Sequence, residues 1–84
     1  MKKRVAVTSI IVENLESVEK LNHILSDYNE YIIGRMGIPY REKGVNLISI
    51  AIDAPEDVIN TMTGKLGKLD GLGAKTNYSN VITE

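Results

Sequence analysis

Two stretches of the chain are dense in β-branched residues and apolar at both alternating sets of positions. Residues 4–12 (RVAVTSIIV) and 45–52 (VNLISIAI) carry aliphatic side chains toward both sides of an extended backbone. Such a pattern is typical of strands in the middle of a sheet, where neither face is left to water. We therefore expect these two stretches to be the central strands.

Apolar residues at helical spacing follow each of these strands. The first set begins after Asn14, whose side chain can cap a helix, and the second begins at a proline with two acidic neighbours. Apolar residues three and four positions apart lie on one side of a helix. The second helix is expected to close at Asp70-Gly71. The predicted buried stripes are Val18, Leu21, Leu25 and Tyr28 in the first helix, and Val58, Ile59, Met62, Leu66 and Leu69 in the second.

Two further stretches are predicted to be strands at the edges of the sheet. Glu30–Tyr40 contains Gly34, Gly37 and Pro39, and proline lacks the N–H that a central ladder would use. We expect this strand to bend or bulge there. The last strand is predicted over Gly73–Val81.

The order strand, helix, strand, strand, helix, strand specifies an α+β fold. We predict that residues 1–84 form a single domain, a ferredoxin-like βαββαβ sandwich whose four-stranded antiparallel sheet carries both helices on one face. The other face would expose aliphatic residues. Because monomers rarely expose large apolar patches, we expect a homodimer or homotetramer that covers this face or pairs the edge at residues 31–40.

Composition excludes several partners. Ten basic and eleven acidic residues give no basic surface for nucleic acid, and the central strands have no aromatic ring to stack on RNA bases. No apolar run approaches the roughly 20 residues of a membrane helix. The absence of cysteine suits a reducing compartment. We expect a soluble cytoplasmic protein that contacts neither nucleic acid nor membrane.

Candidate metal and phosphate sites are weak. His23 is the only histidine, and without cysteine one chain cannot assemble a nickel or zinc site, although an oligomer would bring several copies of His23 together. Residues 64–68 (GKLGK) resemble a phosphate loop only superficially, because they end a helix, where carbonyls rather than N–H groups are free. We predict no metal and no cofactor.

Polar residues gather on the central hairpin, where an aliphatic sheet does not require them. The candidate ligand-binding residues are Arg35, Tyr40, Arg41 and Asn46. An arginine among apolar neighbours needs an anion or a carboxylate once it is buried. The alternative is an arginine in solvent or in an ion pair between subunits. If a ligand binds here, we expect a small anionic effector.

The chain resembles a known family through the 5–12 strand and two longer blocks, GRMGIPYREKGVNLISIAID (34–53) and TGKLGKLDGLGAKTNYS (63–79). These blocks are similar to the small iron-only hydrogenase system regulators. That family is ACT-like in fold and similar to the C-terminal, metal-sensing domain of nickel-responsive regulators, which assemble through this sheet. The resemblance implies a ligand-responsive regulatory module.

The sequence departs from the nickel-sensing pattern. Aligned without gaps, it has Ile38 and Tyr40 where two histidines would stand, Asn46 in place of a cysteine, and Asp27 near a further histidine position. The ribbon-helix-helix segment of those regulators has no counterpart here. We therefore expect neither a nickel site nor direct DNA binding, and a regulatory output would pass through a protein partner.

Three classes of function stay open. The leading hypothesis is a non-enzymatic regulatory module, possessing no catalytic residue, that binds an effector or partner protein. The alternatives are a small acylphosphatase-like enzyme and a purely structural interaction protein. The enzyme would need a phosphate-binding loop after the first strand, where Glu13-Asn14 offers neither glycine nor arginine.

Overall fold

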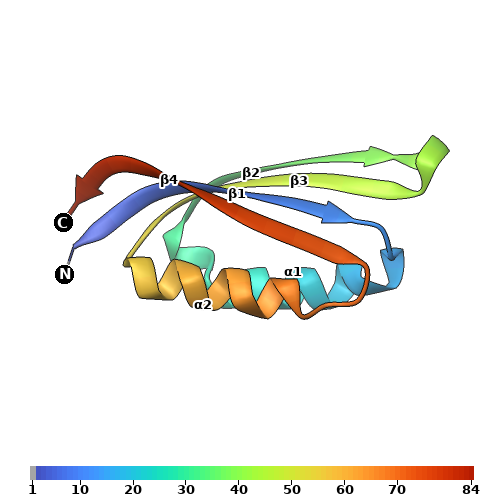
Figure 1. Ribbon diagram of the computed structural model, residues 1–84, viewed down its shortest axis with the longest axis horizontal. Helices are drawn as coiled ribbons and strands as arrows, with labels where there is room; N and C mark the ends of the chain where they lie inside the picture. Colours follow the sequence, from blue (N-terminus) through green and yellow to red (C-terminus); the bar gives the residue numbers. More distant parts are fainter. Residues whose placement is uncertain (1) are drawn as a thin grey trace.

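The computed structural model describes residues 2–84 as a four-stranded sheet with two helices (Figure 1). Met1, which the predicted domain includes, lies outside the described residues. Short 3-10 turns precede α1, β2 and β3. The elements are β1 (Lys3–Val12), α1 (Val18–Asp27), β2 (Ile32–Tyr40), β3 (Val45–Ala54), α2 (Glu56–Gly67) and β4 (Leu72–Thr83), and the turns are Leu15–Ser17, Asn29–Tyr31 and Arg41–Lys43.

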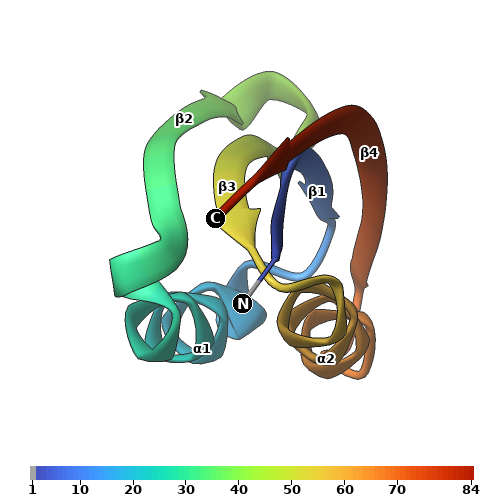
Figure 2. The same cartoon turned by 90° about the vertical axis from the view of Figure 1, so that its left-hand side faces the viewer.

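The sheet has the order β2-β3-β1-β4, and each neighbouring pair of strands is antiparallel. Both helices lie side by side on one face of it (Figure 2). The predicted ferredoxin-like βαββαβ arrangement is thus confirmed, with β1 and β3 in the centre.

The core lies between the sheet and the helices. On β1 the inward set is Ala6, Thr8, Ile10 and Val12, all nearly inaccessible to solvent. Thr8 is the polar member of this set, and its hydroxyl lies 2.9 Å from that of Thr76 on β4. The remaining core residues come from β3, β4 and the two helical stripes: Leu21, Leu25, Tyr28, Ile48, Ile50, Ile52, Ala54, Ile59, Met62, Leu66 and Leu72.

Within residues 2–84, no element covers the opposite face of the sheet (Figure 1). The register places Ile11 beside Leu47, and Leu47 beside Ile38, so one aliphatic row crosses three strands. All three side chains are exposed. This open face is the surface that the sequence predicts to be apolar.

Some boundaries differ from the expected ones. β2 begins at Ile32 because a 3-10 turn occupies Asn29–Tyr31. The irregularity in β2 falls between Ile32 and Gly34, whereas Pro39 stays in register opposite Asn46. The expected irregularity of this strand is therefore confirmed beside Gly34 and wrong at Pro39, which an edge strand accommodates without a break in register.

A polar clasp joins the β1–α1 loop to the α2–β4 turn. Asn14 caps the first helical turn, since its Oδ1 accepts from the N–H of Glu16, and its Nδ2 donates to Asp70. The carbonyl of Gly71 accepts from the N–H groups of Glu13 and Asn14 at 2.6 and 3.2 Å. Gly71 has a φ of +64°, and a Cβ there would lie 2.5 Å from the Cβ of Asn14. Only glycine fits this position.

Candidate functional site

Two shallow cavities lie between α1 and the edge strand β2. Each has a volume of about 230 Å³, and Arg35 lines both of them. We call the pair the α1–β2 groove. The first cavity is lined by Asn22, Leu25, Ser26, Asn29, Ile32 and Arg35, and the second by Val18, Arg35, Gly37, Ile38, Pro39, Asn46 and Ile48.

Arg35 reaches from β2 to α1 and separates the two cavities. Its Nη2 donates to Oδ1 of Asn22 at 2.7 Å, an exposed hydrogen bond to a neutral amide. Within residues 2–84 the one ion pair joins Arg4 and Glu56, so no acidic side chain neutralises Arg35. A guanidinium has five N–H donors, and among residues 2–84 the contact with Asn22 is the one side-chain hydrogen bond that Arg35 makes.

The structure brings two of the four candidate residues together. Asn46 lines the second cavity beside Arg35. Tyr40 stands opposite Val45 on the open face, and its hydroxyl donates to Glu42 at 3.3 Å. Arg41 belongs to the 3-10 turn that ends the hairpin, outside the residues that line the groove.

Arg35 is not buried, unlike the arginine among apolar neighbours that the sequence suggests. The side chain is exposed, so burial does not by itself require an anion. Its partner Asn22 is absent from the sequence-based candidates. Asn22 sits on the polar side of α1, and its proximity to β2 depends on how the helix packs under the sheet rather than on a local motif.

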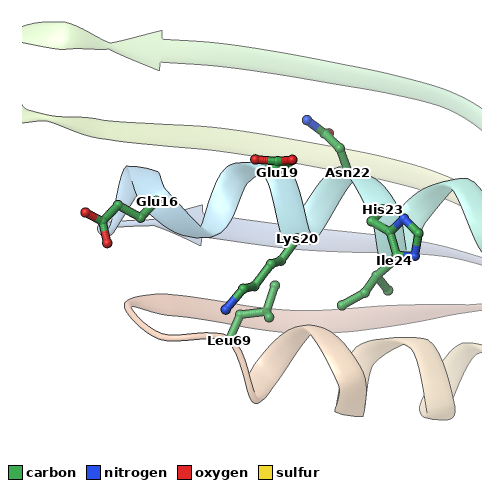
Figure 3. A pocket seen from close by; sticks show the side chains of 7 residues that line it. All are labelled: Glu16, Glu19, Lys20, Asn22, His23, Ile24 and Leu69. Atoms are coloured by element: carbon green, nitrogen blue, oxygen red, sulfur yellow. The ribbon is translucent and has the colours of Figure 1, made fainter.

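A larger and more open cavity of about 830 Å³ lies between α1 and the end of α2 (Figure 3). Lys20 and Ile24 are directed toward Leu69, whereas Glu19 and Asn22 point to the other side of α1. His23 also lines this cavity. Among the described residues, no three histidine or acidic side chains come close enough to hold a metal ion. Because its polar side chains diverge, this cavity is a weaker candidate than the α1–β2 groove.

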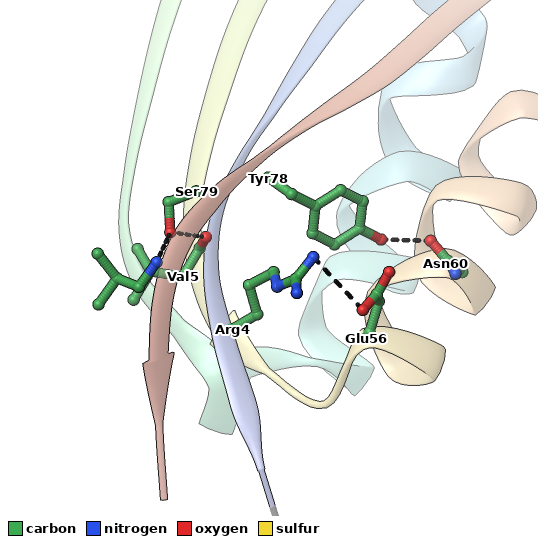
Figure 4. A network of polar contacts seen from close by, with 7 residues as sticks. Arg4, Val5, Glu56, Asn60, Tyr78 and Ser79 are labelled. Atoms are coloured by element: carbon green, nitrogen blue, oxygen red, sulfur yellow. Dashed lines mark hydrogen bonds and ion pairs between the residues drawn. The ribbon is translucent and has the colours of Figure 1, made fainter.

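A polar network near the start of β1 and of α2 joins these two elements to β4 (Figure 4). Arg4 lies over the ring of Tyr78, 5.7 Å from its centroid, and pairs with Glu56 at 3.5 Å. The hydroxyl of Tyr78 donates to Oδ1 of Asn60. Burial raises the pKa of Tyr78, Glu56 raises it further, and Arg4 lowers it. Each of these side chains is engaged by another, which indicates a structural role.

The fold and groove define a small α+β module with one unneutralised arginine in a partly apolar groove. Residues 4–76 match the model of the TM1266-like family, described as "Iron-only hydrogenase system regulator, putative". The chain therefore belongs to this family, and the resemblance noted from the sequence is confirmed.

Two solved structures share the fold of this chain. The structure of the uncharacterized protein TM1266 from Thermotoga maritima is 30% identical, with a TM-score of 0.87 over 90% of this chain and 96% of that chain. A formyltetrahydrofolate deformylase from Pseudomonas putida KT2440 has a TM-score of 0.67 at 13% identity, over 92% of this chain and 29% of that chain, a likeness of fold alone. No curated protein matches the sequence. In residues 2–84, neither helix is long and apolar enough to cross a membrane.

Proposed function

We propose that the chain is a regulatory module of the iron-only hydrogenase system whose effector, a small anion, binds in the α1–β2 groove. The family description supports the regulatory part of this proposal. The observation that carries the effector site is Arg35, a guanidinium that spans the groove with a neutral amide as its partner.

The chemistry of the groove favours a ligand with a carboxylate or phosphate on an apolar body. Charged hydrogen bonds from a guanidinium to such a group contribute roughly 1.5–3 kcal/mol. Val18, Pro39 and Ile48 supply apolar walls beside it, and Asn46 adds an amide. At Gly37 the nearest atom to an added Cβ is Cγ1 of Ile48 at 3.9 Å, so this glycine leaves space beside Arg35.

We propose that the module binds without catalysing a reaction. The hydroxyl of Ser26, which lines the first cavity, donates to the carbonyl oxygen of His23 at 2.7 Å and so has no base to activate it. A protein partner would then receive the signal, because the groove offers a single arginine rather than a basic surface for DNA.

The test compares two arginines of the same hairpin. Protein purified without an affinity tag is examined by native mass spectrometry for a copurifying ligand, and carboxylate and phosphate metabolites are titrated by calorimetry. Arg35→Ala should copurify without the ligand, and its affinity in calorimetry should be at least about tenfold lower than that of the wild type. Arg41→Ala removes the same charge outside the groove and should bind as the wild type does. Equal binding by the wild type and Arg35→Ala would remove the groove as the effector site.

A further inference from the structure

We propose that the open face of the sheet is the interface of a homodimer, with a second copy of this chain as its occupant. This inference is independent of the effector and of the regulatory role. It rests on the order of side chains across the open face, on the area they expose, and on the features of the two sheet edges.

Two rows of side chains cross the centre of the open face. The aliphatic row consists of Ile38, Leu47 and Ile11 on β2, β3 and β1. One step along the strands lies the serine row, in which Ser49 and Ser9 stand side by side. The large residues form a ridge, and the two serines form a notch beside it.

A third row and the outer ends of the serine row complete the description of the open face. Beyond the serine row, Val7 pairs with Ala51, which forms a second and lower apolar row. Met36 and Lys75 occupy the two outer ends of the serine row. The only charge in these three rows is therefore at the rim, on Lys75, while the centre is aliphatic or small and neutral.

Ridge and notch on one surface make that surface self-complementary. A two-fold axis that runs parallel to the rows, midway between the aliphatic row and the serine row, would seat the aliphatic row of one copy in the notch of the other, as closed dimers require. Sheets that pack face to face lie about 10 Å apart, with large side chains from one filling gaps in the other. A nucleic acid or an anionic membrane surface would find no matching charge in the centre.

The area is of the size that a stable dimer needs. Six large residues are 40–61% exposed on this face. At roughly 200 Å² for a fully exposed large side chain, they present about 600 Å² of surface. This is at the upper limit for monomers, and the smaller neighbours bring it near the roughly 800 Å² per partner of standard interfaces. The six residues are Val7, Ile11, Met36, Ile38, Tyr40 and Leu47.

The edges of the sheet are less suited to self-association than its face. The free edge of β2 carries a bulge at its start, and Pro39 stands near its end. β4 has its own irregularity opposite Arg4 and Ala6. Bulges and prolines are features with which proteins protect edges against pairing. The face is therefore the interface that this structure favours.

Light scattering and sedimentation test the proposal with a matched pair of lysine substitutions. The wild type should show a mass near twice 9.3 kDa at micromolar concentration. Leu47→Lys introduces a charge into the aliphatic row and should raise the dimer dissociation constant at least about tenfold. Leu15→Lys is the control, because Leu15 is similarly exposed but lies in the 3-10 turn before α1.

A cysteine crosslink tests the same face with a smaller change. The chain has no cysteine. A single Ser49→Cys substitution should crosslink between copies through a bis-maleimide that spans about 10 Å, the separation of packed sheets. Gly64→Cys on α2 should not, since it lies on the opposite layer.

Each outcome decides the proposal. A dimer that Leu47→Lys weakens and Ser49→Cys crosslinks supports it, and crosslinking alone supports it if Leu47→Lys does not fold. A wild-type mass near 9.3 kDa would overturn it. An oligomer that retains its mass in folded Leu47→Lys and is not crosslinked through Ser49→Cys would place the interface elsewhere.

Discussion

Removal of the Thr76 hydroxyl from the core is expected to lower the free energy of unfolding by more than the hydrogen bonds of Thr76 contribute. Three threonine hydroxyls form a chain from β1 through β4 to α2: Thr8 to Thr76 at 2.9 Å, Thr76 to Thr63 at 2.7 Å, and Thr63 to the carbonyl oxygen of Ile59 at 2.9 Å. A carbonyl only accepts, so Thr63 donates to it. Thr76 must then donate to Thr63, and Thr8 to Thr76, because each hydroxyl has one proton.

The magnitudes follow from the positions in this chain. Thr8→Val removes the first donor and one hydrogen bond, at a cost of about 1 kcal/mol. Thr76→Val removes two hydrogen bonds and leaves the fully buried Thr8 hydroxyl without an acceptor, for about 2–4 kcal/mol in all. The double variant has no Thr8 hydroxyl left without an acceptor. Its free energy of unfolding should therefore fall by about 2 kcal/mol, less than the sum of the two single losses.

Urea denaturation followed by circular dichroism, at one fixed protein concentration, measures these free energies of unfolding. In a domain of this size, 1 kcal/mol corresponds to about 4–8 °C in melting temperature, which provides a second measurement. We expect a coupling energy of at least about 1 kcal/mol between positions 8 and 76. Single losses that add within about 0.3 kcal/mol would refute the hydrogen bond shared by Thr8 and Thr76.

Two further predictions concern Gly71 and Tyr78. Gly71→Ala should lower the free energy of unfolding by at least about 2 kcal/mol, because position 71 combines a left-handed φ with a clash against Asn14. Gly64→Ala lies inside α2 with open space around it and should raise the free energy of unfolding by about 0.5–1 kcal/mol. Thermal melts in which the two variants shift the melting temperature in the same direction would contradict this prediction. The pKa of Tyr78 is raised, so its stabilising contribution is fully present below about pH 10 and is lost as the pH rises through the folded-state pKa. In denaturation series at alkaline pH, the difference in free energy of unfolding between the wild type and Tyr78→Phe should therefore shrink. A difference that stays constant to about pH 11 would exclude Tyr78 as the titrating group.

The sequence predicts the fold well because the information is local and periodic. Aliphatic residues on both sides of β1 and β3 place these strands in the centre, and the stripe from Leu21 to Leu25 turns α1 toward the sheet. The same two-sided pattern does not distinguish the set that faces inward. In the structure Ile10 is buried and Ile11 is exposed, a choice that depends on the side of the sheet that the helices cover.

The candidate site is less predictable, because it depends on distances between elements. Strand alternation separates Tyr40 from Arg35, so a cluster in the sequence is divided between the two faces of the sheet. The contact between Arg35 and Asn22 crosses from β2 to α1 and has no signature in either segment. The anionic effector and the dimer are therefore proposals that experiments on these residues will decide.

The most direct test of the regulatory role replaces the chromosomal gene in a cell that makes an iron-only hydrogenase. Hydrogenase transcript and activity are compared for the wild type, a deletion, Arg35→Ala and Arg41→Ala, with each protein confirmed to be folded and equally abundant. We expect Arg35→Ala to reproduce the deletion and Arg41→Ala to match the wild type. A deletion without effect on hydrogenase would contradict the regulatory role, and an Arg35→Ala strain equal to the wild type would contradict the effector site.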